Sequence, residues 1–283
     1  PGTPKQQYNI SDHGESLINL DDAQIIDGKY YNRDGESCLP VIESKYFSQY
    51  NHRHATQSDR VTGTEISQII DPDFEIQTRY LMRKDDHTRE SPLGALLVYR
   101  VITSITTSPR TCIASLVPAY PCSNSCTTIV GCSRKEQLAL LAIMNSFAFD
   151  FAVRSKLPGN NLNVWIWKQL PFPTYERVST PIFEGNSFIE WVYPKVAELS
   201  FTSYSLRNFF SGFSGPFNWN KEKRFQLRAE IDAAVFHLFQ FSRKEVIQIL
   251  DGFTLCKSKE IDQFGSFKSL ELIVKNEAKY EEY

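Results

Sequence analysis

Residues 43–45 of this 283-residue chain read Glu-Ser-Lys, which is half of the carboxylate–lysine pattern of metal-dependent nucleases. In such sites a pair of carboxylates holds Mg²⁺, and the lysine stabilises a hydroxide or the departing charge. Asp27 or Asp34 could supply the second carboxylate. The tripeptide is common, however, and its alternative explanation is a surface ion pair between Glu43 and Lys45.

Six cysteines are the other residues that could bind a metal. Cys122, Cys126 and Cys132 form a C-x3-C-x5-C run, and Cys112 lies ten positions before its first member. Thiolates could bind zinc, but this run has no C-x2-C knuckle. Its cysteines lie within or beside β-branched segments, where free cysteine is a common small buried side chain. We therefore expect no metal site and reduced thiols, which favours a cytoplasmic protein.

The sequence has no loop that would let this chain transfer a methyl group by itself. It contains no P-loop and no Pro-Pro pair, and so neither the Asn-Pro-Pro nor the Asp-Pro-Pro loop that holds a target amino group. Residues 209–217 carry two glycines, but they follow a helical segment and lack the G-x-G-x-x-G spacing. No Ser-His-Asp or Cys-His arrangement is recognisable. We predict no catalytic residue in this chain.

Basic and aromatic side chains gather in residues 50–60 and 79–89. Arginine and lysine suit phosphate oxygens and the guanine edge, and asparagine suits adenine. Such loops can also be merely solvated, but their concentration in an acidic protein favours binding to double-stranded DNA. The residues that we expect to contact DNA are His52, Arg53, Arg100, Arg110, Arg154, Asn160, Asn161 and Lys168.

The composition excludes two classes of protein. With 31 Lys and Arg against 33 Asp and Glu, the net charge is -2, so the chain is not a uniformly basic nucleic-acid binder. A local basic face is still possible, because phosphate responds to the local field. No apolar run approaches the roughly 20 residues that a membrane span needs, so we expect no membrane partner. The polar start without a Met suggests a fragment of a longer protein.

Residue patterns predict an α+β fold. Runs rich in β-branched residues predict strands, and segments with helical spacing follow them. The strands are expected within residues 94–105, 110–121 and 126–132. The predicted parts are a polar lead-in segment at 1–37, a mixed-sheet α+β domain at 38–175 and a helical domain at 176–283.

Two capping boxes mark helix starts. Residues 133–136 open a helix that should end at 158–159, and residues 242–245 open another. Residues 227–253 indicate a helix hairpin, and its apolar stripe must pack against another part of the protein. Between these helices, residues 162–169 alternate as a strand would.

Five ordered blocks of the sequence resemble one family. Residues 39–53 resemble L-P-L-Y-E-G-K-M…Q-[FY]-D-H-R, and residues 99–118 resemble R-x-I…N-E-R-T-x-I-A-A-x-L-P. Residues 144–173 resemble L-N-S…F-D…R…G-G-T-x-L-N…Q-L-P-x-P. Residues 198–239 resemble E-L-x-x-T…P-P-F-x-W-D-E-x-R-R…L-R-A-E-L-D-A…H-L-Y-G-L, and residues 261–274 resemble E-Y-G-x-[FY]-R-T-x-x-L-V-L. These blocks are similar to the C-terminal halves of large bacterial adenine-N6 DNA methyltransferases of restriction-modification and phage-defence systems, including the combined type IIG-like enzymes.

The resemblance implies a target-recognition region, similar to the specificity domain of Taq-type adenine methylases, followed by a helical domain. It implies that the catalytic Asn-Pro-Pro-Tyr loop and the S-adenosylmethionine pocket lie upstream, outside this chain. We therefore expect no cofactor in the chain itself. Its expected task is to bind duplex DNA and to position it for the upstream methyltransferase domain of the same protein, which in the combined class also cleaves DNA.

The chain departs from the family pattern in several loops, which would then read DNA differently. The departures are Asn51 for Asp, Pro109 for Glu, Asn160 and Asn161 for Gly-Thr, and Phe239 with Gln240 for Tyr-Gly. Two other hypotheses stay open. One is a metal-dependent nuclease that uses Glu43 and Lys45, and the other is an interaction scaffold that never touches DNA.

Overall fold

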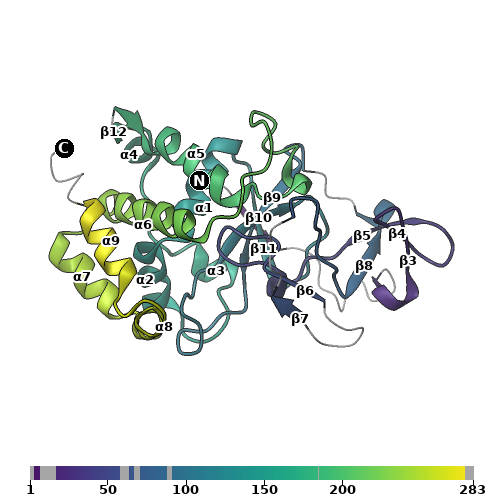
Figure 1. The fold of residues 1–283 in the computed structure, drawn as a ribbon, viewed down its shortest axis with the longest axis horizontal. Coiled ribbons are helices and arrows are strands. Elements are labelled where there is room, and N and C mark those ends of the chain that lie inside the picture. The colour runs from purple at the N-terminus through teal and green to yellow at the C-terminus, as the bar shows by residue number, and fades with distance from the viewer. Residues whose placement is uncertain are drawn as a thin grey trace.

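The computed structural model describes residues 3–6, 17–57, 64–66, 71–87, 91–183 and 185–277. Within these ranges the chain forms an α+β fold, as the residue patterns predict. Antiparallel sheets make up one side of the molecule and helices make up the other, with a central sheet between them (Figure 1).

The central sheet contains the three predicted strands, which are thereby confirmed. In spatial order its strands are β1 (Thr3–Gln6), β11 (Cys126–Val130), β9 (Ala95–Arg100) and β10 (Ala114–Pro118). Side chains alternate across β9, so Leu97 packs in the main core and Val98 in a smaller core on the other face. Both faces are therefore covered, which explains the unbroken apolar runs in the sequence.

The prediction of a mixed sheet was wrong for the described strands. Every strand pair in the two larger sheets is antiparallel. A parallel pair needs a long crossover connection, usually through a helix, and the described residues 95–130 contain no helix.

A second antiparallel sheet of short strands lies beside the central one (Figure 1). In spatial order its strands are β2 (Leu17–Asn19), β8 (Tyr80–Arg83), β5 (Ser37–Pro40), β4 (Lys29–Tyr31) and β3 (Gln24–Ile26). Asp27 and Gly28 join β3 to β4 with positive φ, as a two-residue hairpin turn requires. Part of the predicted lead-in segment therefore belongs to a sheet. Two further strand pairs are β6 (Ala55–Gln57) with β7 (Thr64–Ile66) and β12 (Pro181–Phe183) with β13 (Asn186–Ser187).

The helices follow the central sheet in the sequence. They are α1 (Arg134–Met144), α2 (Phe147–Lys156), α3 (Val164–Trp167), α4 (Tyr175–Ser179), α5 (Phe188–Ser200), α6 (Lys221–Leu238), α7 (Arg243–Asp251), α8 (Thr254–Phe264) and α9 (Lys268–Glu277). Both predicted capping boxes are confirmed. The backbone N–H of Ser133 donates to the Glu136 carboxylate at 2.8 Å, and that of Ser242 donates to the Glu245 carboxylate at 2.8 Å.

The helix predicted after Ser133 is broken into α1 and α2. At the break, the Asn145 amide accepts from the Ala114 N–H at 2.9 Å and donates to the Ala114 carbonyl at 3.0 Å. Ser146 then caps α2 by accepting from the Phe149 N–H at 3.1 Å. Asn145 thus fixes the corner between the two helices to strand β10.

Residues 164–167 form the short helix α3, so the prediction of a strand at 162–169 was wrong. The Asn163 side chain accepts from the Ile166 N–H at 3.3 Å and caps α3. On the inner side Trp167 is buried and stacks on Tyr99 of β9, with ring centroids 6.3 Å apart. Alternating apolar residues over so few positions fit either structure, and the asparagine cap favours the helix.

One hydrophobic core runs across the predicted domain boundary at residue 175. It joins Leu97 of β9, Leu141 of α1, Val192 of α5 and Val235 of α6. The stripe of the predicted helix hairpin therefore belongs to the same core as the sheet, where α6 packs against α1, α2, α5 and α9.

No single helix among the described residues is long and apolar enough to cross a membrane. The pair α1 and α2 passes that test together, but the two helices are bent by 66° and most of their residues are buried in the core.

We predict that Asn145→Ala lowers the free energy of unfolding by about 1–3 kcal/mol, because it leaves the buried N–H of Ala114 without its acceptor. The Ala114 carbonyl loses one donor but keeps the Tyr50 N–H at 3.2 Å. Urea unfolding measures this loss. The control Gln248→Ala removes an exposed amide on α7 and should stay within about 0.5 kcal/mol of the parent chain. Equal stability of the two variants would contradict the role of Asn145.

Candidate nucleic-acid interface

Arg53, a predicted DNA contact, holds three backbone segments together instead. Its guanidinium donates to the carbonyls of Asp71 at 2.8 Å, Phe74 at 2.5 Å and Thr202 at 2.6 Å. Arg53 is 0% exposed, so it does not reach DNA in this conformation, and the prediction for this residue was wrong.

The neighbouring His52 is also buried, with 4% of its surface exposed, and its Nε2 bonds to Ser205 Oγ at 3.1 Å. Burial, reinforced by the charge of Arg53, lowers the pKa of His52 to about 3. The imidazole is therefore neutral near pH 7 and offers phosphate no charge. The predicted DNA contact at His52 was wrong for the same reason as at Arg53.

Arg110 and Arg154 share the fully buried carboxylate of Asp150. Their Nε atoms lie 2.9 and 3.4 Å from its oxygens, and the Thr111 N–H donates to the same carboxylate at 2.9 Å. The Arg110 guanidinium also donates to the Asn145 carbonyl at 2.7 Å and lies 3.8 Å from the centre of the Phe147 ring. Arg110 is 6% exposed, so it is a structural residue, and the prediction of a DNA contact was wrong.

Two of the predicted arginines are only half-buried, but the protein backbone occupies part of their guanidinium groups. Arg154 donates to the Pro109 carbonyl at 3.1 Å, and Arg100 donates to the Phe47 carbonyl at 3.1 Å. Burial lowers the pKa of Arg100. These contacts favour a structural role for both.

Two loops, one of which carries the predicted contacts Asn160 and Asn161, lie beside α3, which Lys168 follows. We call these loops the loop pair and define them as residues 101–109 and 158–163. The Thr103 N–H donates to the Asn160 carbonyl at 2.8 Å, and the Leu162 N–H donates to the Val101 carbonyl at 2.8 Å. An antiparallel bridge joins Ile102 to Asn161 between these bonds. The loop pair thus behaves as a short ribbon at the end of the central sheet.

The loop pair and α3 present apolar and polar side chains to solvent together. Ile102 and Trp165 are each 60% exposed, and Asn160, Asn161 and Lys168 are exposed as well. Successive residues of a helix are 100° apart, so burial of Trp167 turns Trp165 outward. The sequence carried this signal in the Asn163 cap, but the strand interpretation of 162–169 hid it.

The segments around the loop pair contain no carboxylate. Residues 91–135 and 151–175 have no Asp or Glu, although the chain carries 33 of them. No acidic residue in these segments offsets the positive charge of Lys168. The Ser and Thr hydroxyls of residues 103–108 likewise have no carboxylate in the same segments. The local charge of these segments therefore differs in sign from the net charge of the protein, and the local field is what a phosphate group responds to.

The other motifs form no site in the described part of the chain. Glu43 and Lys45 pair with each other at 3.1 Å, and no group of three His, Cys, Asp or Glu among the described residues could hold a metal ion. Cys112 packs in the main core, whereas Cys122 and Cys126 pack in the smaller core. Arg60 and Arg89 of the two basic clusters lie outside the described residues, and Arg83 pairs with Asp86 at 2.9 Å.

No protein-family model matches this chain, and no curated protein matches its sequence significantly. The resemblance to adenine-N6 DNA methyltransferases therefore stays a prediction.

We predict that Arg110→Gln lowers the free energy of unfolding by about 3–5 kcal/mol, because it removes the nearest cation from a buried carboxylate. Urea unfolding is the measurement. The control Arg33→Gln breaks an exposed pair with Asp22 and should cost less than about 1 kcal/mol. A loss at Arg110 no larger than the loss at Arg33 would refute the buried pair.

We predict that stability falls as the pH falls below about 6.5, in part because of His52. The unfolded chain takes up a proton at His52 near pH 6.5, whereas the folded chain does so only near pH 3. Unfolding therefore gains protons in this window, and acid favours it. In His52→Gln the slope of unfolding free energy against pH should flatten by up to about 1.4 kcal/mol per pH unit between pH 4 and 6. Parallel slopes in urea titrations would exclude a neutral buried histidine.

Proposed function

We propose that this chain binds double-stranded DNA through the loop pair and α3, and that it is the target-recognition region of a site-specific adenine-N6 DNA methyltransferase. The observation that carries the DNA-binding part is the exposure of Ile102, Trp165 and Lys168 on segments that contain no Asp or Glu; we call the exposed side chains of these segments the acid-free surface. The assignment to a methyltransferase rests on the resemblance of the five sequence blocks.

Each exposed residue has a distinct task in this proposal. Lys168 and the hydroxyls of residues 104–108 contact phosphates and set the register of the duplex. Asn160 and Asn161 offer amides that can pair with an adenine edge. Ile102 and Trp165 provide apolar contact with thymine methyl groups or with an unstacked base step. In this proposal, side chains on the short, hydrogen-bonded ribbon of the loop pair recognise the DNA sequence.

The bond-making step belongs to the upstream domain in this proposal. That domain would carry the Asn-Pro-Pro-Tyr loop and S-adenosylmethionine, and it would act on an adenine turned out of the duplex. Turning a base out costs a few kcal/mol in lost stacking, and a firm grip on the flanking DNA offsets that cost. The present chain supplies the grip and the choice of site.

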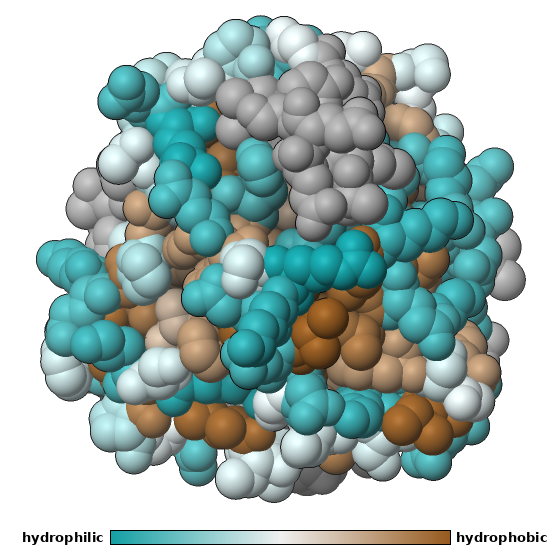
Figure 2. Space-filling view, turned by 90° about the vertical axis from the view of Figure 1, so that its left-hand side faces the viewer, coloured by the Kyte–Doolittle hydropathy of each residue, from teal (hydrophilic) through white to brown (hydrophobic). Residues whose placement is uncertain are grey.

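The helical end of the molecule is the surface that we propose faces the upstream domain. Figure 2 shows apolar side chains on this end, separated by hydrophilic ones. Exposed apolar residues here are Ile247 of α7 and Ile261 and Phe264 of α8, each about 40% exposed. Exposed apolar side chains interspersed with polar ones suit contact between two domains of one protein.

The two alternative functions have less support. For the nuclease hypothesis, no group of three His, Cys, Asp or Glu that could hold a metal ion forms around Glu43 among the described residues. A scaffold that never touches DNA leaves the acid-free surface and its exposed Trp165 without a role.

The test is fluorescence anisotropy of a labelled duplex with the full chain at several salt concentrations. Binding should weaken steeply with salt, because each phosphate contact adds about 0.9 to the slope of log K against log salt. Lys168→Ala should reduce this slope by about one contact. Trp165→Ala should weaken binding roughly tenfold and leave the slope unchanged, because the indole contributes contact rather than charge.

The matched control is Lys244→Ala, which removes an exposed lysine from α7. It should bind DNA as the parent chain does. No binding at about 50 mM salt, where electrostatic contacts are strong, or equal effects of Lys168→Ala and Lys244→Ala, would overturn the proposal.

A further inference from the structure

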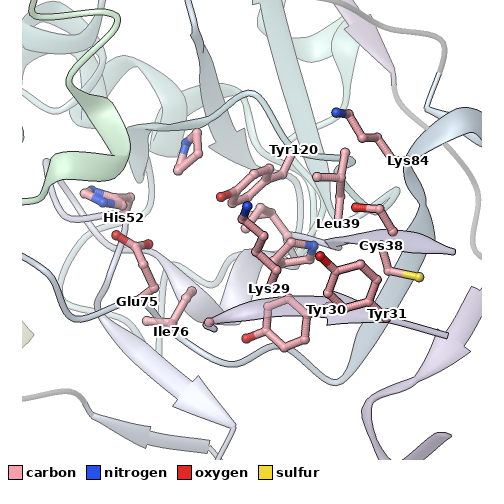
Figure 3. A pocket seen from close by; sticks show the side chains of 15 residues that line it. Lys29, Tyr30, Tyr31, Cys38, Leu39, His52, Glu75, Ile76, Lys84 and Tyr120 are labelled. Atoms are coloured by element: carbon pink, nitrogen blue, oxygen red, sulfur yellow. The ribbon is translucent and has the colours of Figure 1, made fainter. Parts of the chain in front are cut away.

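A cavity of about 370 Å³ lies between the five-stranded sheet and the end of the central sheet. Its walls come from β4, β5, residue Glu75 and the loop that follows β10 (Figure 3). The volume lies at the lower end of the range for small-molecule pockets, roughly 300–1,000 Å³. The proposed DNA surface, made of the loop pair and α3, uses none of these residues.

Three tyrosines line this cavity, and none of them has a ring partner or a hydroxyl partner among the described residues. Tyr30 and Tyr31 come from β4, and Tyr120 comes from the loop after β10; all three are half-buried. Burial and the charge of Glu75 raise the pKa of Tyr30 and Tyr120, so both hydroxyls keep their protons and can donate. Half-buried rings with free faces and free donors suit a planar ligand with acceptor atoms.

An acidic acceptor is held at one end of the cavity by a chain of hydroxyl groups. Ser203 Oγ donates to Glu75 Oε1 at 2.6 Å and lies 3.0 Å from Ser205 Oγ, which in turn bonds to His52 Nε2 at 3.1 Å. Figure 3 shows Glu75 and His52 together at this end. A carboxylate accepts several hydrogen bonds, so Glu75 can still accept from a ligand N–H. His52 is a positioning residue here.

Two lysines line other parts of the wall. In the view of Figure 3, Lys84 and Glu75 are at opposite ends of the cavity and Lys29 is between them. Both lysines are exposed, and neither forms a salt bridge with a described residue. They are therefore available to an anionic group at the mouth of the cavity.

We propose that this cavity binds one nucleotide whose base carries an exocyclic amino group. The base lies against the tyrosine rings, its amino group donates to Glu75, and its phosphate binds Lys29 and Lys84. Aromatic faces suit any base. The carboxylate accepts from an exocyclic amino group, which adenine, cytosine and guanine carry and thymine does not; the ring N3–H of thymine lies at a different position and does not replace that contact. The nucleotide is either free or a single unpaired residue of a strand. The proposal is independent of the loop pair.

The test is isothermal titration of the full chain with dAMP, dCMP, dGMP and dTMP, each compared with its nucleoside and with inorganic phosphate. At least one amino-bearing nucleotide should bind about tenfold more tightly than dTMP, as a hydrogen bond to a charged group allows. Removal of its phosphate should also weaken binding. A DNA hairpin with one unpaired nucleotide competes only if the cavity accepts a nucleotide joined to a strand.

Variants separate the parts of the site. Glu75→Gln should abolish the preference over dTMP while leaving dTMP binding unchanged, and Lys84→Ala should weaken nucleotides but not nucleosides. Tyr120→Ala should weaken both. The controls are Lys244→Ala and Tyr175→Ala, which remove an exposed lysine and a tyrosine that is 66% exposed from α7 and α4.

Thermal unfolding of each variant distinguishes a lost ligand contact from a lost fold. Absence of binding by all four nucleotides at millimolar concentration overturns the proposal. So does binding that Tyr120→Ala and Lys84→Ala leave unchanged while both variants stay folded. Because duplex binding is measured separately, failure here leaves the proposed DNA surface untouched.

Discussion

The proposed DNA surface depends on the hydrogen bonds that the buried carboxylate of Asp150 accepts. It is 0% exposed and accepts from Arg110 and from the Thr111 N–H, both at 2.9 Å. The Thr111 carbonyl accepts from Thr103 Oγ1 at 2.5 Å, and the Thr103 N–H donates to the Asn160 carbonyl at 2.8 Å. An unbroken series of hydrogen bonds thus runs from α2 through one loop to the other. A loop fixed in this way loses little entropy on binding.

Hydrogen bonding within the protein also explains why Arg53 and Arg110 are buried. Arg53 and Arg110 each donate to backbone carbonyls of remote segments, and the flat guanidinium group suits several acceptors at once. What is left for solvent on the acid-free loops is amide, hydroxyl, lysine and apolar surface. That mixture can read base edges while a few charges hold the backbone of the duplex.

Local signals in the sequence predicted the local structure well. The β-branched runs predicted the strands β9 to β11, and the two Ser…Glu capping boxes predicted the starts of α1 and α7. The wrong predictions concern residues whose partners are remote. Arg53 is buried against the carbonyl of Thr202, 149 positions away, and nothing near Arg53 in the sequence reveals that partner. The cavity near Tyr30 and Tyr120 was missed for the same reason, because β4 and the loop after β10 meet only in the fold.

Hydrogen exchange of the full chain with and without a duplex tests the central claim most directly, because it locates the contact without any substitution. If the loop pair and α3 bind DNA, amide exchange should slow in residues 101–109 and 158–168, while α7 to α9 exchange at their former rates. Slower exchange confined to α7 to α9, or none in the loop pair at saturating duplex, would contradict the account.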